Sequence, residues 1–248
     1  MLQLTLIQID NYGPWTTTPL PKKETYLQAL QSGLYHTLQK KFSAHKALVL
    51  PMRYDNMIAI TNGMTESQHL AIMHAVNKKF PVSVSMSIAV GKTPYEAQKT
   101  ATKQLSACGG AQQENRKAVV VSSGASCDAV CITHFDIDGI TAQTNANVYD
   151  SYTLVVETER ALIKHLTPRG ALVFYMGGDN FIAPCSMLAK EELCAIIKKI
   201  EKETGISLKA GIGVGPTPEE AVYRASLGLK QIRRARGSVL VKNGNPQK

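Results

Sequence analysis

The strongest constraint on the fold of this 248-residue chain is an internal repeat. Gly91–Ala97 recurs as Gly215–Ala221 with five of the seven residues identical, at an offset of 215 − 91 = 124. Asp55-Asn56 recurs as Asp179-Asn180 at the same offset, because 179 − 55 = 124. Repetition at one offset across separated blocks is typical of a duplicated structural unit. The sequence therefore predicts two similar domains.

A third block extends the repeat towards the N-terminus. Asp10 with Gly13 matches Asp136 with Gly139 at an offset of 136 − 10 = 126, two residues away from the other register. A polar segment rich in small residues, 109–117, separates the two copies. Each copy then has the size of a typical domain, roughly 100–150 residues. We expect the two domains to be residues 1–125 and residues 126–248.

Each half has the same predicted order of strands and helices. In the first half, the strand-like segment Leu2–Asp10 precedes a Gly- and Pro-rich loop and a helix with a stripe of leucines. A hairpin around Asp55, a second helix, a strand at 82–90 and a helix begun by Thr93-Pro94 follow. This order predicts an α+β protein, a tandem duplication of ferredoxin-like (palm) βαββαβ domains with antiparallel sheets.

The palm order places the end of the first strand beside the hairpin, so two acids meet in each half. Asp10 is expected near Asp55, and Asp136 near Asp179. Two neighbouring carboxylates repel each other unless a cation lies between them, and Mg²⁺ prefers such oxygen ligands. These four aspartates are therefore the candidate catalytic and metal-binding residues, with Mg²⁺ as the expected metal.

A turn is the competing explanation for the acids of the second half. Gly177–Asn180 contains residue types that suit a tight hairpin turn. However, the first half keeps Asp55-Asn56 without the glycines, which favours metal binding. Asp138, on the same strand face as Asp136, either supplies a further metal ligand or caps the loop.

Substrate-binding candidates surround the first pair of acids. The residues directly after the first strand can offer backbone amides to a triphosphate. Arg53 and Lys209 are the basic side chains best placed to reach phosphates. Tyr12 and Trp15 either stack on a base or pack over the loop. The candidate substrate-binding residues are Asn11, Tyr12, Gly13, Arg53, Asn56 and Lys209.

The composition agrees with a globular protein that binds an anionic small molecule. The net charge is +9, which suits a polyanionic partner such as a nucleotide. Five cysteines without a CxxC pair indicate neither a disulfide framework nor a zinc site. No apolar run approaches the roughly 20 residues of a membrane helix, and the N-terminus lacks a basic targeting region. We expect a cytoplasmic protein without membrane or nucleic-acid partners.

Asp136-Ile137-Asp138 together with Gly177–Phe181 resembles the palm of nucleotidyl cyclases and GGDEF-type diguanylate cyclases. In that superfamily, acids on the first strand and the hairpin hold two metal ions. This chain has Asn180 where a GGDEF motif has Glu, and Leu172 where the inhibitory RxxD motif has its acid. These differences argue against a signalling cyclase.

The whole chain more closely resembles archaeal GTP cyclohydrolase III, also called GTP cyclohydrolase IIa, duplication included. The segments that carry the resemblance are Ile9–Thr16, Ala44–Lys46, Asp55-Asn56, Ala59–Gly63, Thr93–Gln98, Gly177–Phe181 and Lys209–Gly213.

The resemblance implies a GTP-opening hydrolase of riboflavin and deazaflavin synthesis. It implies hydrolysis of GTP to 2-amino-5-formylamino-6-(5-phospho-ribosylamino)pyrimidin-4(3H)-one and diphosphate, with the formyl group retained. It also implies two Mg²⁺ ions per site, a K⁺ ion as helper, and a homo-oligomer. The match is densest around Asp10 and Asp55, which are expected to form the working site. The rival hypotheses are a purine nucleotidyl cyclase and a non-catalytic nucleotide sensor.

Overall fold

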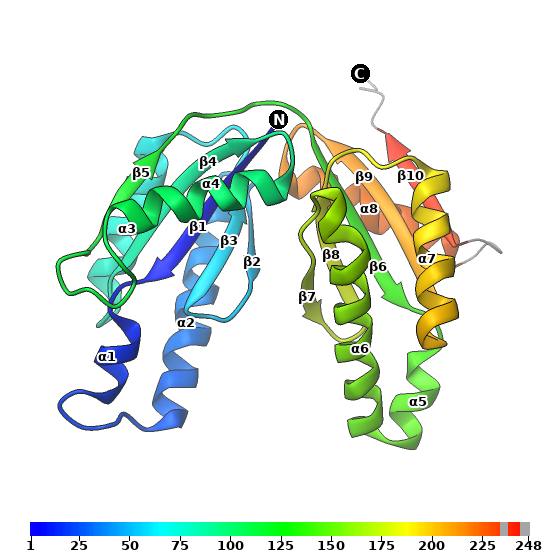
Figure 1. Cartoon of the computed structure of the whole chain (residues 1–248), viewed down its shortest axis with the longest axis horizontal. Coiled ribbons are helices and arrows are strands. Elements are labelled where there is room, and N and C mark those ends of the chain that lie inside the picture. The colour runs from blue at the N-terminus through cyan, green and yellow to red at the C-terminus, as the bar shows by residue number, and fades with distance from the viewer. Residues whose placement is uncertain (234–237, 244–248) are drawn as a thin grey trace. The chain divides into compact units, whose positions relative to one another are not determined.

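The computed structural model describes residues 1–233 and 238–243, which belong to two compact units (Figure 1). The first unit comprises Met1–Lys92 and Glu96–Asp128, and the second comprises Thr93–Tyr95 and the chain from Ala129. The main division thus lies three residues after the sequence-based boundary at 125, because 128 − 125 = 3. In addition, a short segment at 93–95 belongs to the second unit.

The first part of the chain forms a five-stranded sheet and four helices. The sheet order is β2-β3-β1-β4-β5, so β1 lies between the hairpin strand β3 and β4. The elements are β1 (Leu2–Ile9), α1 (Tyr12–Thr17), α2 (Glu24–Ser43), β2 (Leu48–Pro51), β3 (Asn56–Ile60), α3 (Glu66–Lys79), β4 (Val84–Gly91), α4 (Pro94–Ala107) and β5 (Val120–Ser122).

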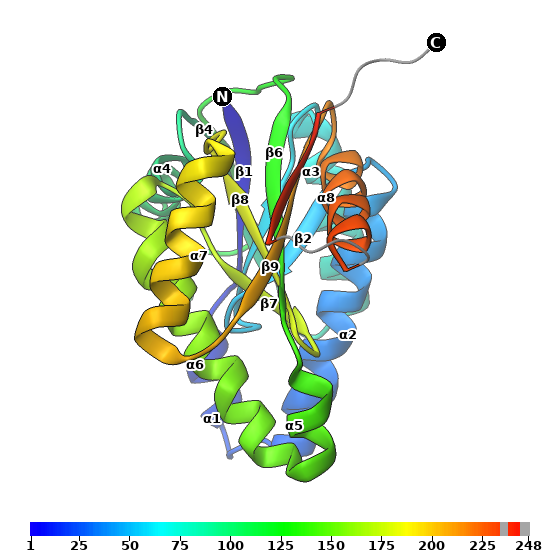
Figure 2. The same cartoon turned by 90° about the vertical axis from the view of Figure 1, so that its right-hand side faces the viewer.

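The second part repeats this order, and its sheet has the order β10-β9-β6-β8-β7. Figure 2 shows α6 and α7 on one side of this sheet and α8 on the other. The elements are β6 (Val130–Ile137), α5 (Ile140–Ala146), α6 (Val148–Leu166), the 3₁₀ turn Thr167–Arg169, β7 (Phe174–Gly177), β8 (Asn180–Cys185), α7 (Lys190–Thr204), β9 (Leu208–Gly215), α8 (Pro218–Ile232) and β10 (Val239–Asn243).

The predicted α+β duplication is confirmed, with one refinement of the antiparallel sheets. The edge strands β5 and β10 pair in parallel with β4 and β9. Each edge strand follows a crossover helix, which returns the chain in its original direction. The sequence also did not predict the short helices α1 and α5, which directly follow the first strand of each unit.

The core of the first unit lies between its sheet and helices α2 and α3. Leu30, Leu34 and Leu38 of α2 are buried against Ile7 and Ile9 of β1 and neighbouring core residues. The remaining residues of β1 are also almost all buried, which explains why its apolar residues do not alternate simply. This burial fixes β1 as the rigid element that carries Asp10 at its end.

Helix α8 packs on β9 so closely that only glycine fits beneath it. A Cβ atom on Gly211 would lie 2.1 Å from the carbonyl oxygen of Ala225, and one on Gly213 would lie 2.1 Å from that of Ala221.

No helix in the described part of the chain is long and apolar enough to cross a membrane.

Backbone hydrogen bonds at the end of β1 correct the register of the internal repeat. The amide of Asp10 donates to the carbonyl of Ser83 at 2.9 Å, and the amide of Asp138 donates to the carbonyl of Ser207 at 2.9 Å. Ser83 and Ser207 are 207 − 83 = 124 residues apart, so they are true equivalents. The structural counterpart of Asp10 is therefore Asp138, and the expected match with Asp136 is wrong.

Asp136 instead takes the place of a glutamine. Gln8 lies opposite Asn56 in the β1–β3 pair, and Asp136 lies opposite Asn180 in the β6–β8 pair. The chain from the strand acid to the hairpin acid is four residues shorter in the second unit, because 55 − 10 = 45 and 179 − 138 = 41. Because of this difference, the sequence comparison matched Asp10 with Asp136 and not with Asp138. The two units therefore carry acids at different positions of the first strand.

Candidate functional site

Two cavities flank the end of β1 in the first unit. One has a volume of about 390 Å³ and is lined by candidate residues that follow β1 or precede β3. The other has a volume of about 250 Å³ and includes Asp10, Asn11 and Trp15. The first cavity contains Gln8, Tyr12, Gly13, Arg53, Asp55 and Asn56 among its lining residues. Asp10 and Asp55 thus line different cavities, although the Ile9 amide donates to the Asp55 carbonyl at 2.9 Å and so places both residues at this end of the sheet.

Asp10 is buried and its carboxylate is fully engaged by protein donors. The hydroxyls of Ser83 and Ser85 donate to it at 2.8 and 2.7 Å. The backbone amide of Ala118 donates at 2.9 Å, and Arg116 Nε donates at 3.2 Å. An anion with four donors and a neighbouring cation is compensated without a metal ion. These contacts tie Asp10 to β4 and to the linker, and its metal ligation stays a prediction.

Arg116 is the partner that the sequence analysis missed. Its guanidinium is almost completely buried, pairs with Asp10 at 3.2 Å and donates to Gln8 Oε1 at 2.6 Å. An arginine in a polar linker carries no pattern that distinguishes it from an exposed side chain. Only the structure reveals that the linker folds back over the end of β1.

Asp55 has the opposite character, because one of its carboxylate oxygens has no partner. Its Oδ2 accepts a hydrogen bond from Arg53 at 2.7 Å, whereas Oδ1 is buried without any donor. Its backbone carbonyl accepts from the amide of Ile9 at 2.9 Å, which fixes it beside β1. A buried anionic oxygen without a donor is costly unless a cation approaches it. Asp55 therefore fits a hard cation such as Mg²⁺.

The residues after β1 form a turn and the short helix α1. Asn11 adopts a left-handed conformation, with φ of 50°, and its amide donates to the carbonyl of Ala111 at 2.7 Å. Its side-chain Oδ1 is buried without a donor, which provides a second uncompensated oxygen near the end of β1. The amide of Asn11 is thus not free for phosphate, but its side-chain oxygen is available to a cation or a ligand N–H.

Tyr12 and Trp15 stack on each other, with ring centroids 6.0 Å apart and ring planes at 23°. The ammonium of Lys22 lies 4.2 Å from the centre of the Trp15 ring. Burial raises the pKa of Tyr12, and the negative charge of Asp55 adds to this effect. Trp15 is therefore packed within the loop, and Tyr12 is the aromatic side chain that lines the Asp55 cavity.

The remaining candidates of the first unit also line the Asp55 cavity. Gln8 Nε2 donates to Asn56 Oδ1 at 2.5 Å, which orients the asparagine. Arg53 is exposed over three quarters of its side chain and can move towards a ligand. A Cβ atom on Gly13 would lie 3.2 Å from the Gln112 amide, so glycine lets the linker approach closely.

In the second unit, basic side chains neutralise the strand acids. Arg233 Nε donates to Asp136 at 3.3 Å, and Lys209 donates to Asp138 at 2.6 Å. Asp179 Oδ1 accepts a hydrogen bond from the side-chain Nδ2 of Asn180 at 2.7 Å. Asp179 also lines a separate cavity of about 390 Å³ beside α5 and α6. Lys209, a candidate phosphate-binding residue, is thus paired with Asp138.

His134 supports the hairpin of the second unit rather than an acid. Its ring nitrogens lie 3.0 Å from Asn180 Oδ1 and 3.0 Å from Ser226 Oγ. Burial lowers the pKa of His134, although the Asn180 hydrogen bond and Asp136 act in the opposite direction. The side chain that shares a face with Asp136 is therefore a positioning group.

The described side chains do not assemble a ready-made multi-acid metal centre. Among residues 1–233 and 238–243, no group of three or more His, Cys, Asp or Glu side chains could hold a metal ion. The expected cluster of Asp136, Asp138 and Asp179 is therefore not formed. A Mg²⁺ site in the described residues would therefore combine one or two protein oxygens with other ligands, such as substrate phosphates.

A family model described as GTP cyclohydrolase III matches residues 1–244. The chain belongs to the GTP cyclohydrolase III family. GTP cyclohydrolase III of Methanothermobacter thermautotrophicus is 45% identical over 236 residues, which cover 94% of this chain and 95% of the relative. That of Methanocaldococcus jannaschii is 47% identical over 247 residues, which cover 98% and 91%. This GTP cyclohydrolase III family member is therefore matched along nearly its entire length.

Among solved structures, this member of the GTP cyclohydrolase III family is similar to a GGDEF domain from Pseudomonas aeruginosa. The TM-score is 0.40 at 20% identity, and the match covers 48% of this chain and 84% of that domain. A GGEEF domain of a diguanylate cyclase from Vibrio cholerae matches with a TM-score of 0.40 at 12% identity.

Proposed function

We propose that this chain is a magnesium-dependent hydrolase that opens the imidazole ring of GTP and releases diphosphate. The product would be 2-amino-5-formylamino-6-(5-phospho-ribosylamino)pyrimidin-4(3H)-one. Membership of the GTP cyclohydrolase III family supports the substrate. The observation that carries the metal dependence is the buried Oδ1 of Asp55, which has no donor although it lines a cavity.

In this proposal, the first unit carries the working site and Asp55 holds Mg²⁺ against the phosphates. When bound, Mg²⁺ polarises phosphoryl oxygens and lowers the pKa of a bound water. Arg53 releases Asp55 to the metal and pairs with a phosphate, for which its exposed guanidinium is suited. Asn56 and Tyr12 line the same cavity and orient the nucleotide.

Asp10 acts indirectly in this scheme. Through Arg116 and the amide of Ala118, it fixes the linker that closes both cavities. The second unit supplies an additional or vestigial site around Asp179. A K⁺ ion near the guanine and a homo-oligomeric assembly belong to the same proposal and are supported by the family resemblance alone.

The decisive experiment incubates the chain with GTP and MgCl₂ and follows guanine absorbance and diphosphate release together. We expect guanine absorbance to fall as diphosphate appears, and the formylated pyrimidine to be found by mass spectrometry. Diphosphate release with an unchanged guanine spectrum would instead identify a nucleotidyl cyclase. Bound GTP without turnover would identify a nucleotide sensor.

A further inference from the structure

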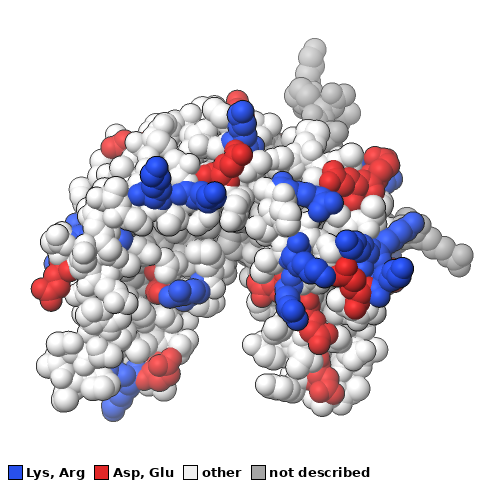
Figure 3. Space-filling model, in the orientation of Figure 1, with Lys and Arg blue, Asp and Glu red and all other residues white. Residues whose placement is uncertain are grey.

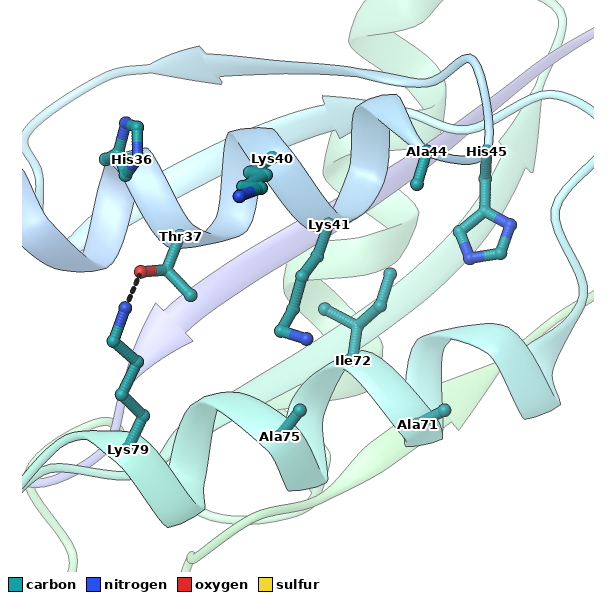
Figure 4. Close-up of a pocket in the computed structure, with 10 residues that line it drawn as sticks. All are labelled: His36, Thr37, Lys40, Lys41, Ala44, His45, Ala71, Ile72, Ala75 and Lys79. Carbon is teal, nitrogen blue, oxygen red and sulfur yellow. Dashed lines mark hydrogen bonds between the residues drawn. The ribbon is translucent and has the colours of Figure 1, made fainter.

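A basic groove runs between α2 and α3 of the first unit, and the candidate site does not use it. It has a volume of about 640 Å³ and shares no lining residue with the Asp10 and Asp55 cavities. Figure 4 shows its two walls, with α2 above and α3 below. The lining residues with titratable side chains are His36, Lys40, Lys41, His45 and Lys79.

The groove contains cations without anions to neutralise them. None of its lining residues is an acid, and the only acids on α2 and α3 are Glu24 and Glu66, the first residue of each helix. The ammonium groups of Lys40 and Lys41 make no ion pair with any residue in the described ranges. Lys41 extends from α2 towards Ile72 of α3, so its charge projects into the groove (Figure 4).

A buried hydroxyl fixes one end of the groove. Lys79 crosses from α3 and donates to Thr37 Oγ1 at 2.9 Å, while Thr37 donates to the carbonyl of Gly33 at 2.8 Å (Figure 4). Thr37 is itself buried, so it holds the lysine in a defined position. At the opposite end, the His45 ring extends from the turn after α2 towards α3 (Figure 4). The groove is therefore bounded by a donor at each end.

The duplicated unit provides an internal comparison. The equivalent groove between α6 and α7 has a volume of about 620 Å³, but acids and bases alternate in it. Lys164 pairs with Glu203 at 2.8 Å, and Glu157 and Arg160 also line it. Figure 3 shows basic and acidic side chains interleaved over this face of the second unit. The fold thus does not require an all-cationic groove, because the equivalent groove of the second unit contains acids as well as bases.

We infer that the α2–α3 groove binds an oligophosphate chain, either inorganic or carried by a nucleotide. From His36 to Ser43, its last residue, α2 rises by roughly 10 Å, which exceeds the size of one phosphate group. Lysine ammonium groups bind phosphates as point charges. The floor is formed by small side chains, Ala71 and Ala75, beside Ile72. It therefore lacks the deep apolar pockets that anchor a partner helix.

The test is calorimetric titration of the whole chain with tripolyphosphate, diphosphate, orthophosphate and ATP, in metal-free buffer. Three proteins are compared: the wild type, Lys40→Gln/Lys41→Gln, and the control Lys198→Gln/Lys199→Gln. The control removes the same charge from the exposed face of α7. Adding Lys79→Gln to the groove variant removes the remaining ammonium group.

We expect the wild type and the control to bind tripolyphosphate more tightly than orthophosphate. The groove variant should bind it at least tenfold more weakly. Equal affinity for tripolyphosphate and ATP would indicate that the phosphate chain alone is recognised, whereas tighter ATP binding would indicate a nucleotide source. GTP turnover of the groove variant should equal that of the wild type in phosphate-free buffer, which separates this site from the proposed function.

The inference would be overturned if the groove variant and the control bound tripolyphosphate with equal affinity. It would also be overturned if the wild type did not bind tripolyphosphate. An oligoglutamate peptide that binds more tightly than tripolyphosphate would also overturn it, since the occupant would then be an acidic peptide. Unchanged circular dichroism of both variants shows that a loss of binding does not come from unfolding.

Discussion

Arg116 reaches back over 106 residues to place its guanidinium 3.2 Å from the carboxylate of Asp10, with both side chains buried. This pair joins the end of β1 to the linker that follows α4. It fixes the position of an acid that the sequence pattern suggested as a metal ligand, and it leads to the first prediction.

Replacing Arg116 with Met should destabilise the first unit by about 3–5 kcal/mol, because it leaves a buried carboxylate without its cation. Trp15 is the only tryptophan and lies in the Asp10 cavity, so its fluorescence during urea unfolding reports on this unit. Arg53→Met is the matched control. It breaks an exposed ion pair and should cost less than about 1 kcal/mol. Equal losses in the two variants would contradict the anchoring role.

Asp55→Asn should reduce GTP turnover by roughly 100-fold or more, because loss of metal ligation removes several kcal/mol of transition-state stabilisation. The unfolding midpoint should stay close to that of the wild type, since the Oδ1 atom has no protein partner to lose. Asp179→Asn makes the same change in the second unit and should retain most activity. The reverse result would place the working site in the second unit.

Chelation of divalent metal should abolish turnover, and MgCl₂ should restore it. Calcium should restore it poorly, because it prefers more ligands at longer distances than magnesium does. The Trp15 unfolding curve without nucleotide should be the same with and without the chelator. A chelated enzyme that still opens GTP would exclude the metal-dependent proposal.

The stability of the first unit should fall below about pH 6.5 because of His69. Burial lowers the pKa of His69 from its usual 6.5, although a hydrogen bond with the Thr65 carbonyl opposes the shift. The unfolded chain therefore takes up a proton before the folded chain does, so acidification favours unfolding, by up to about 1.4 kcal/mol per pH unit. Measured by Trp15 fluorescence, the pH dependence should be shallower in His69→Gln. Parallel curves for the two proteins would refute this assignment.

Gly213→Ala should destabilise the second unit by about 1–3 kcal/mol, because its Cβ would overlap the backbone of α8. Gly33→Ala, at a helical position where the nearest atom is 3.5 Å away, is the control and should be neutral or slightly stabilising. Far-UV circular dichroism during urea unfolding measures both. A tolerated Gly213→Ala would mean that α8 does not pack on β9 as described.

The sequence was sufficient to predict the fold. The repeat revealed the duplication, and local patterns such as the leucine stripe of α2 showed which faces are buried. The site was predicted less completely. Asp55 stood out as a candidate because an aspartate occurs in the hairpin of both units. The match of Asp10 with Asp136 failed because four residues are missing between strand and hairpin in the second unit. Arg116 could not be found, since a contact over 106 residues leaves no local trace.

The anchoring of β1 by the linker also affects how the protein is made. A ribosome releases the chain from its N-terminus, so Asp10 emerges long before Arg116 and Ala118, which compensate its charge. Until those residues leave the exit tunnel, Asp10 at the end of β1 has no partner to neutralise it. Folding of the first unit can therefore be completed only after residue 118 has been synthesised, close to the start of the second unit.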